Sequence, residues 1–199
     1  MKNNIKKSNS SYHRWKWFSY SYLALVEIGL KKLREEINHP SNVKDIKHYF
    51  VFCKKYLFIP IIYNLKHALE IILKGLNIQG NNGYIQTHDI MLNNNALQSI
   101  INESTDNQNI NTLIDIINKY YRMEFFNKIL VQKIKISDIH NDIFRFPENS
   151  VKFSLDSECF GRLKKQEINE FIDELEKDIA LLFKLLITIS EDISDAKKI

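Results

Sequence analysis

The sequence predicts an all-α fold, a bundle of four or five helices that ends in a long C-terminal helix. Three observations indicate this. The 199 residues include only five Gly and three Pro, too few for the turns that a sheet-rich fold needs. Apolar residues recur at spacings of three and four along most of the chain, and 44% of all residues are hydrophobic, enough to fill one core. We expect one domain over residues 17–199, preceded by a basic extension over residues 1–16.

The first helix is expected over about residues 17–38. Apolar side chains recur there at spacings of three and four, and Leu25 and Ile28 are among them. Pro40 follows directly. Because proline cannot continue a helix, we expect the chain to turn at this point.

A second helix is expected to begin after Asn42, with Asp45 in an acidic first turn. This is the composition of a capped helix start, and apolar residues then recur over residues 46–57. Pro60 lacks the N–H group that the helical ladder needs, and its ring crowds the preceding turn. The sequence therefore predicts a break or a kink just before Pro60.

A third helix is expected from Pro60 to Gly75, where glycine is a common helix terminator. The next residues, 77–86, read as a polar loop rich in Gly and Asn. Thr87 is expected to cap the following helix, which three consecutive asparagines weaken. A fourth long segment follows it in the chain.

This fourth segment is expected over about residues 111–133. Its predicted inner face consists of Leu113, Ile114, Ile117, Tyr120, Tyr121 and Phe125. Residues 134–160 do not show helical periodicity, and short alternating pieces such as VKFSL predict an irregular excursion or a small hairpin there. The prediction of an all-α domain includes this one exception.

The C-terminal helix carries the clearest periodic pattern in the chain. Its apolar residues alternate between spacings of four and three for more than three heptads: Ile168, Ile172, Leu175, Ile179, Leu182, Leu186, Ile189 and Ile193. Further apolar residues widen this seam beyond that of a two-stranded coil. Two interpretations stay open, the core of a bundle or a seam between two molecules.

Several classes of protein are disfavoured by composition. Cys53 and Cys159 have no second Cys or His at metal-ligand spacing, so we expect no metal, no disulfide and no cofactor. The basic N-terminus lacks the cleavage pattern of a signal peptide, and no uncharged apolar run reaches roughly 18 residues. We therefore expect a cytoplasmic protein that does not enter the membrane. P-loop, nucleophile-elbow and dinucleotide fingerprints are also missing from the sequence.

Charge is distributed unevenly along the chain. Residues 1–75 carry 14 Lys and Arg against 5 Asp and Glu, whereas residues 76–199 carry 14 against 19. A basic half of this kind suits a nucleic acid or an acidic partner, and an acidic half suits the basic half of another subunit. An ordinary solvated surface is the alternative. The expected partners are a second copy of the chain or other subunits of a complex, with RNA as a further candidate.

Three pieces of the chain, taken in order, resemble the HEPN-like superfamily. They are NLKHALEIILKGL, then THDI with a downstream leucine, and IFRFP before the C-terminal helix; the matching residues are Glu70, Lys74, His88, Asp89, Arg145, Phe146 and Pro147. The resemblance covers roughly residues 45–190. It implies a compact helical bundle of the kind common in prokaryotic toxin, abortive-infection and antiviral systems.

Ribonucleases of that superfamily carry an Arg and, four to six residues later, a His on a late helix. Such a pair can serve acid-base chemistry at the 2′-hydroxyl and offset phosphate charge. Only Arg34 and His39 fit the spacing here, and they lie at the end of the first helix, beside Pro40. We interpret this match as coincidental. If the chain cleaves RNA, a composite site of His88 and Arg145 with Lys74 is the better candidate.

Two further groups of residues are candidates for binding a ligand or RNA. His67, Glu70 and Lys74 fall on one face of a helix, where Lys74 suits a phosphate, although Glu70 and Lys74 also form an ordinary i, i+4 pair. His88 and Asp89 are expected at a helix N-terminus, with Asp89 favoured by the helix dipole and His88 bonding a neighbouring helix.

The second group lies in the run YHRWKWFSYSY, in which Arg14 and Lys16 alternate with aromatic residues such as Trp15. Alternating cations and rings are typical of single-stranded nucleic-acid binding. The run also suits the start of a helix that docks on its own bundle.

These observations lead to three functional hypotheses. The first is a HEPN-like, non-catalytic interaction or regulatory subunit of a bacterial defence or conflict system. The second is a metal-independent endoribonuclease of the same fold, of the toxin type. The third is a nucleic-acid-binding module that uses the basic N-terminal half.

Overall fold

The computed structural model describes residues 5–6, 12–38, 46–80, 84–85, 88–101, 108–122 and 164–196, and within them the fold is an all-α helical bundle, as predicted. Its helices are α1 (Tyr12–Asn38), α2 (Ile46–Gln79), α3 (Ile90–Ile101), α4 (Gln108–Tyr121) and α7 (Lys165–Ala196). Two short strands, β1 (Ile5–Lys6) and β2 (Tyr84–Ile85), pair antiparallel. None of the helices in the described ranges has the length and apolarity to cross a bilayer.

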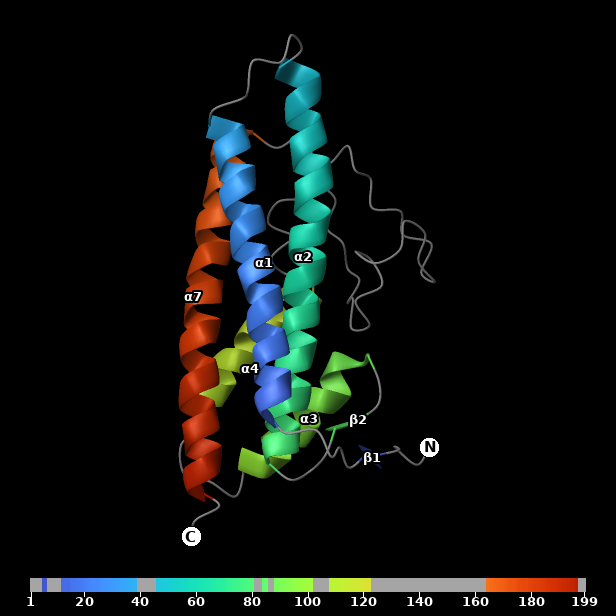
Figure 1. Cartoon of the computed structure of the whole chain (residues 1–199), viewed down its shortest axis with the longest axis vertical. Coiled ribbons are helices and arrows are strands. Elements are labelled where there is room, and N and C mark those ends of the chain that lie inside the picture. Colours follow the sequence, from blue (N-terminus) through green and yellow to red (C-terminus); the bar gives the residue numbers. More distant parts are fainter. Residues whose placement is uncertain are drawn as a thin grey trace.

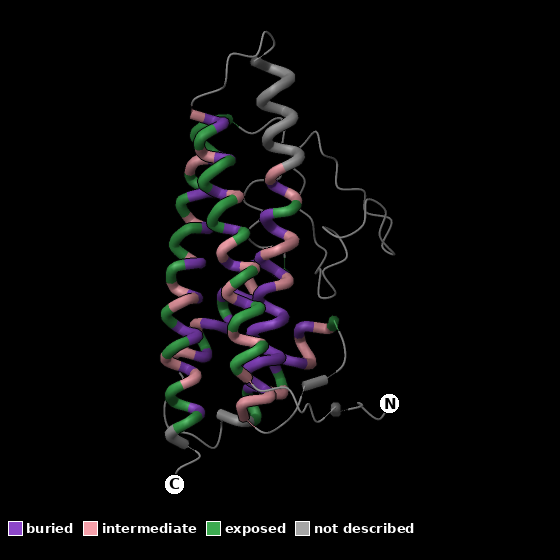
Figure 2. The backbone as a smooth tube through the Cα atoms, viewed as in Figure 1, coloured by how far each residue is buried: buried purple, intermediate pink, exposed green. Residues whose placement is uncertain are grey.

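The three long helices α1, α2 and α7 run side by side along the length of the molecule (Figure 1). The shorter helices α3 and α4 lie against their lower part in that view, near the chain ends. α1 packs most extensively against α2, and α7 packs against α1 and α4. Figure 2 shows the buried residues of each helix turned toward the interior of the bundle. The bundle therefore has one shared core.

α1 begins five residues earlier than predicted, so the aromatic and basic run forms its first turns instead of preceding the domain. Leu25 and Ile28, which are part of the apolar pattern that predicted this helix, have exposed side chains. The buried stripe of α1 consists instead of Leu23, Val26, Leu30, Leu33 and Ile37. Apolar residues occur on more than one face of α1, so their spacing alone did not determine which face is buried. Packing against α2 and α7 determines it.

The second and third predicted helices are one helix, α2, and this corrects two predictions. The chain stays helical through Pro60, where a break was expected, and through Gly75, where the helix was expected to end. Burial on both sides of the proline compensates for the hydrogen bond that it cannot make, since Phe58, Ile61 and Ile62 are in the core. α2 continues to Gln79, and the first residues of the predicted 77–86 loop are its last turn.

α4 begins at Gln108, three residues before its predicted start, whereas α3 begins at Ile90, directly after the predicted start residues His88 and Asp89. Asp89 caps α3: its Oδ1 atom accepts hydrogen bonds from the backbone N–H groups of Met91 at 2.9 Å and Leu92 at 3.4 Å. In α4 the predicted inner-face residues up to Tyr121 are buried. The predicted cap Thr87, Phe125, both cysteines' side chains and the excursion over residues 134–160 lie outside the described residues.

In α7 all eight residues of the predicted seam are buried in the bundle, so its interpretation as a core is the one that the structure supports. Ion pairs at its surface connect it to the neighbouring helices. Arg34 of α1 donates to Asp173 at 2.7 Å and to Glu176 at 2.8 Å. Lys119 of α4 contacts Asp178 at 2.7 Å, and the Tyr120 hydroxyl donates to the same carboxylate at 2.6 Å.

Candidate functional site

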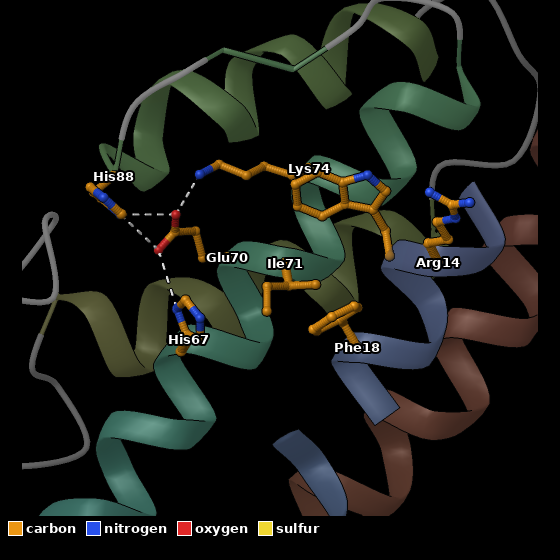
Figure 3. Close-up of a pocket in the computed structure, with 8 residues that line it drawn as sticks. Arg14, Phe18, His67, Glu70, Ile71, Lys74 and His88 are labelled. Carbon is orange, nitrogen blue, oxygen red and sulfur yellow. Dashed lines mark hydrogen bonds and ion pairs between the residues drawn. The ribbon is translucent and has the colours of Figure 1, made fainter. Parts of the chain in front are cut away.

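A pocket with a volume of about 420 Å³ opens where the first turns of α1 face the second half of α2 and the start of α3 (Figure 3). α1 contributes three lining residues, α2 four, and the segment before α3 one. The residues are Arg14, Trp15, Phe18, His67, Glu70, Ile71, Lys74 and His88. The pocket therefore combines aromatic and aliphatic side chains with five titratable ones.

Gly75 allows α1 to come close to α2 at this pocket. A Cβ atom on Gly75 would lie 2.9 Å from Trp15 Cβ, closer than side-chain atoms pack, so a larger residue would push the α1 backbone away. Glycine in the interior of a helix costs up to about 1 kcal/mol relative to alanine. Its presence in α2 is explained by the position that it gives Trp15 beside Lys74.

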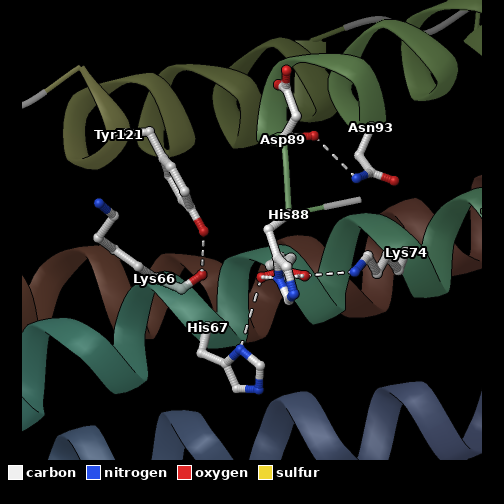
Figure 4. A network of polar contacts seen from close by, with 8 residues as sticks. Lys66, His67, Lys74, His88, Asp89, Asn93 and Tyr121 are labelled. Carbon is white, nitrogen blue, oxygen red and sulfur yellow. Dashed lines mark hydrogen bonds and ion pairs between the residues drawn. The ribbon is translucent and has the colours of Figure 1, made fainter. Parts of the chain in front are cut away.

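Glu70 holds the polar side of the pocket together. Its side chain is buried, and Lys74 Nζ donates to Glu70 Oε1 at 2.5 Å. His88 Nδ1 lies 3.0 Å from Oε1 and 3.3 Å from Oε2, and His67 Nδ1 lies 3.8 Å from Oε2 (Figure 4). One carboxylate thus orients an ammonium group and two imidazole rings from two different segments of the chain.

The same contacts keep Glu70 ionised. Burial raises its pKa, whereas the interactions with His67, Lys74 and His88 lower it, and the balance lowers the pKa from 4.5 to about 2. The contact to His67 is longer than a hydrogen bond at 3.8 Å, so we assign most of the lowering to Lys74 at 2.5 Å. Glu70 is therefore a carboxylate at every physiological pH.

The two histidines have different surroundings. The His67 ring meets the Tyr22 ring edge-on at 4.7 Å between centroids and stacks on Tyr63 at 5.9 Å. His88 is more than half exposed and immediately precedes the Asp89 cap of α3. Because the Nδ1 atoms face Glu70, Nε2 is the ring atom that each histidine can direct to a ligand.

Most of the predicted binding residues converge here. Arg14, Trp15, His67, Glu70, Lys74 and His88 all line the pocket, although three different segments supply them. The two structural roles predicted for the start of α3 are also present. Asp89 caps the helix, and His88 lies within hydrogen-bond distance of Glu70 on α2.

Other predicted candidates do not join the pocket. Lys16 is not among its lining residues, and its ammonium group lies 5.7 Å from the centre of the Tyr20 ring. Arg34 is engaged with Asp173 and Glu176 of α7, in agreement with a structural role. His39 and Arg145 lie outside the described residues.

Two lining residues were not predicted, Phe18 and Ile71. Phe18 lies one helical turn after Trp15, and Ile71 lies one turn after His67. This spacing was a usable signal for both. Phe18 stands in a run whose most evident pattern is the alternation of cations and rings. Ile71 is one of many apolar residues in α2, and its spacing alone does not distinguish it from the core residues.

The arrangement suits a ligand that has both an anionic group and a flat apolar part. Arg14 and Lys74 supply permanent positive charge, and Trp15 and Phe18 supply ring faces. Within the described ranges, no three His, Cys, Asp or Glu side chains are placed to hold a metal ion. No family model matches the chain, and no curated protein or solved structure matches it either.

Proposed function

We propose that the protein acts by binding, and that the pocket beside Glu70 holds a nucleotide unit of single-stranded RNA. The observation that carries the proposal is the convergence of cations and rings in one cavity of about 420 Å³. This volume falls in the lower part of the range of roughly 300–1,000 Å³ typical of ligand pockets. A base can stack on Trp15 or Phe18 while a phosphate meets Lys74 or Arg14.

Neutralising Lys74 and Arg14 tests this proposal. We expect Lys74→Met and Arg14→Gln each to weaken the binding of a short single-stranded RNA by about tenfold, since a hydrogen bond to a charged group contributes about 1.5–3 kcal/mol. Lys16→Gln is the matched control, because Lys16 is a cation of α1 that does not line the pocket. The measurement is fluorescence anisotropy of labelled RNA at two salt concentrations.

If all three variants lose affinity equally, the binding is a general effect of the basic N-terminal half and the pocket plays no special role. Equal affinity of all three and the original protein would contradict the proposal as well. Circular dichroism of each variant checks that the helices persist.

A binding role agrees with the first hypothesis, a HEPN-like subunit without catalysis, in a bacterial defence or conflict system. The resemblance to HEPN-like proteins remains part of the proposal, because it rests on the sequence motifs alone.

A second candidate function is metal-independent cleavage of RNA. It is favoured by the placement of His67 and His88 on the same carboxylate, an arrangement that can supply a general base and a general acid. A cleavage assay with chelator present separates the candidates. Cleavage that is lost in His67→Ala and His88→Ala but retained in Arg34→Ala would favour the enzyme over the binding protein.

We also propose that the chain forms a homodimer through an exposed apolar face of α1. The α7 seam is buried, whereas Trp17 and Ile28 are 71% and 65% exposed, and Leu25, which lies between them in the sequence, is exposed as well. Clustered apolar side chains of this size mark contact surfaces more often than ordinary solvated ones.

The expected result is a concentration-dependent dimer in sedimentation velocity, which Trp17→Lys with Ile28→Lys converts to a monomer. The exposed charged residue Lys31 serves as the control site on α1 through Lys31→Ala. A wild-type monomer at all concentrations would contradict the homodimer.

A further inference from the structure

The pocket has a buried floor and an exposed rim. Glu70, Ile71 and Lys74 form the floor and are 3%, 7% and 9% exposed. Arg14 and Phe18, at the rim, are exposed. Figure 3 shows the rim side chains on α1 facing the floor residues of α2, with His88 reaching Glu70 from the opposite side. A group that reaches the floor therefore passes the exposed side chains of the rim.

From this geometry we propose that the pocket selects a nucleotide that carries a terminal phosphomonoester, at an end of an RNA or as a free mononucleotide, over an internal nucleotide. The inference rests on the proposed function and names the ligand group that this site takes.

The shape of the pocket is the first argument. An internal nucleotide continues into a chain on both sides, whereas a terminal one continues on one side only. With the floor closed by α2 and a volume of about 420 Å³, the pocket has room for about one nucleotide. A terminal nucleotide can insert its phosphate and leave the remaining chain outside the rim.

Charge is the second argument. A phosphomonoester carries about −1.5 to −2 charges near pH 7, in contrast to the single charge of a phosphodiester. The pocket offers two permanent cations, Arg14 and Lys74, against one carboxylate, Glu70, so these three groups together carry a net positive charge. Because the attraction between a positively charged site and an anion grows with the charge of the anion, a dianionic phosphomonoester is favoured over a singly charged phosphodiester.

Preorganisation is the third argument. Glu70 fixes Lys74 by a 2.5 Å contact and faces the Nδ1 atom of His88 at 3.0 Å. Tyr22 and Tyr63 hold the His67 ring from α1 and α2. The donors are thus ordered before a ligand arrives, and an oxyanion with three acceptor oxygens can bond several of them at once.

The test is a competition assay with one RNA sequence in four forms: a 5′-phosphate, a 3′-phosphate, hydroxyls at both ends, and a closed circle. A nucleoside monophosphate, the matching nucleoside and inorganic phosphate are added as separate competitors. We expect at least one phosphate-ended form, or the mononucleotide, to bind about tenfold more tightly than the hydroxyl-ended and circular forms. The arms separate a 5′-end, a 3′-end and a free nucleotide as sources of the phosphate.

The preference is expected to disappear in Lys74→Met and in His88→Gln and to remain in Lys16→Gln. His88→Gln serves as the second variant because His88 is largely exposed and tolerates substitution better than Lys74. Equal affinity for all four RNA forms would overturn this inference and leave RNA binding in place. Tight binding of the mononucleotide without any RNA binding would support the terminal phosphomonoester and overturn RNA as its source, and no binding of any competitor would overturn both proposals.

Discussion

Replacing Glu70 with alanine is expected to lower the free energy of unfolding by about 3–5 kcal/mol, the typical effect of removing one partner of a buried ion pair. Glu70 is buried in α2, and its carboxylate contacts Lys74, His67 and His88. The substitution removes the counter-charge of Lys74 and the acceptor of His88 together. Urea denaturation at neutral pH measures the effect.

The matched control is Glu176→Ala. Glu176 also pairs with a cation, Arg34, but about half of its side chain is exposed. Exposed pairs contribute about 0–1 kcal/mol, so the control should change little. Equal losses in the two variants would show that burial does not distinguish the Glu70 cluster from a surface pair.

The stability that Glu70 contributes is also expected to depend on pH. Its pKa is about 2 in the folded protein and 4.5 without the protein environment, so the folded state favours the ionised form. The contribution is therefore fully present above pH 4.5 and is lost as the pH falls toward 2, and the shift corresponds to about 3 kcal/mol. Denaturation between pH 5 and pH 2 should show this loss in the wild type and a smaller one in Glu70→Gln.

Shortening Leu182 to alanine is the second change for which we expect a large effect. Leu182 lies in the middle of the α7 seam and is fully buried. Leucine-to-alanine changes in a core cost about 2–5 kcal/mol, because apolar burial is lost and a cavity remains. Thermal or urea unfolding measures the difference.

Ile187→Ala is the control on the same helix, since Ile187 is 47% exposed. We expect Ile187→Ala to lower the free energy of unfolding by less than about 1 kcal/mol, because this side chain buries less apolar area on folding. A larger loss at Ile187 than at Leu182 would contradict the placement of the seam in the core and would favour a seam between molecules.

The sequence was a good guide to the helices that have one strongly apolar face. In α7 the regular four-three spacing predicted all eight seam residues, which are buried. In α4 helical spacing predicted most of the buried residues but missed Ile110 and Ile116. In α1 the apolar residues surround the helix, so spacing alone did not separate buried Val26 from exposed Leu25. Contacts with neighbouring helices decided that difference, and a single sequence does not contain them.

Local rules failed in α2 because tertiary packing overrode them. Pro60 and Gly75 are helix breakers by propensity, but buried neighbours hold the helix around Pro60, and Gly75 makes room for Trp15. Most residues that line the pocket were predicted as separate binding candidates, but the pocket itself was not. Their convergence in one pocket was not predictable, because Arg14, Lys74 and His88 come from three segments that meet only when the helices pack.

We propose that RNA binds in the pocket lined by α1, α2 and the start of α3. Photo-crosslinking of a thiouridine-containing RNA, followed by mass spectrometry of the digested protein, tests it most directly. We expect crosslinks on Trp15, Phe18 or His88, and we expect these crosslinks to be lost in Lys74→Met. Crosslinks confined to peptides that contribute no side chain to the pocket would contradict it.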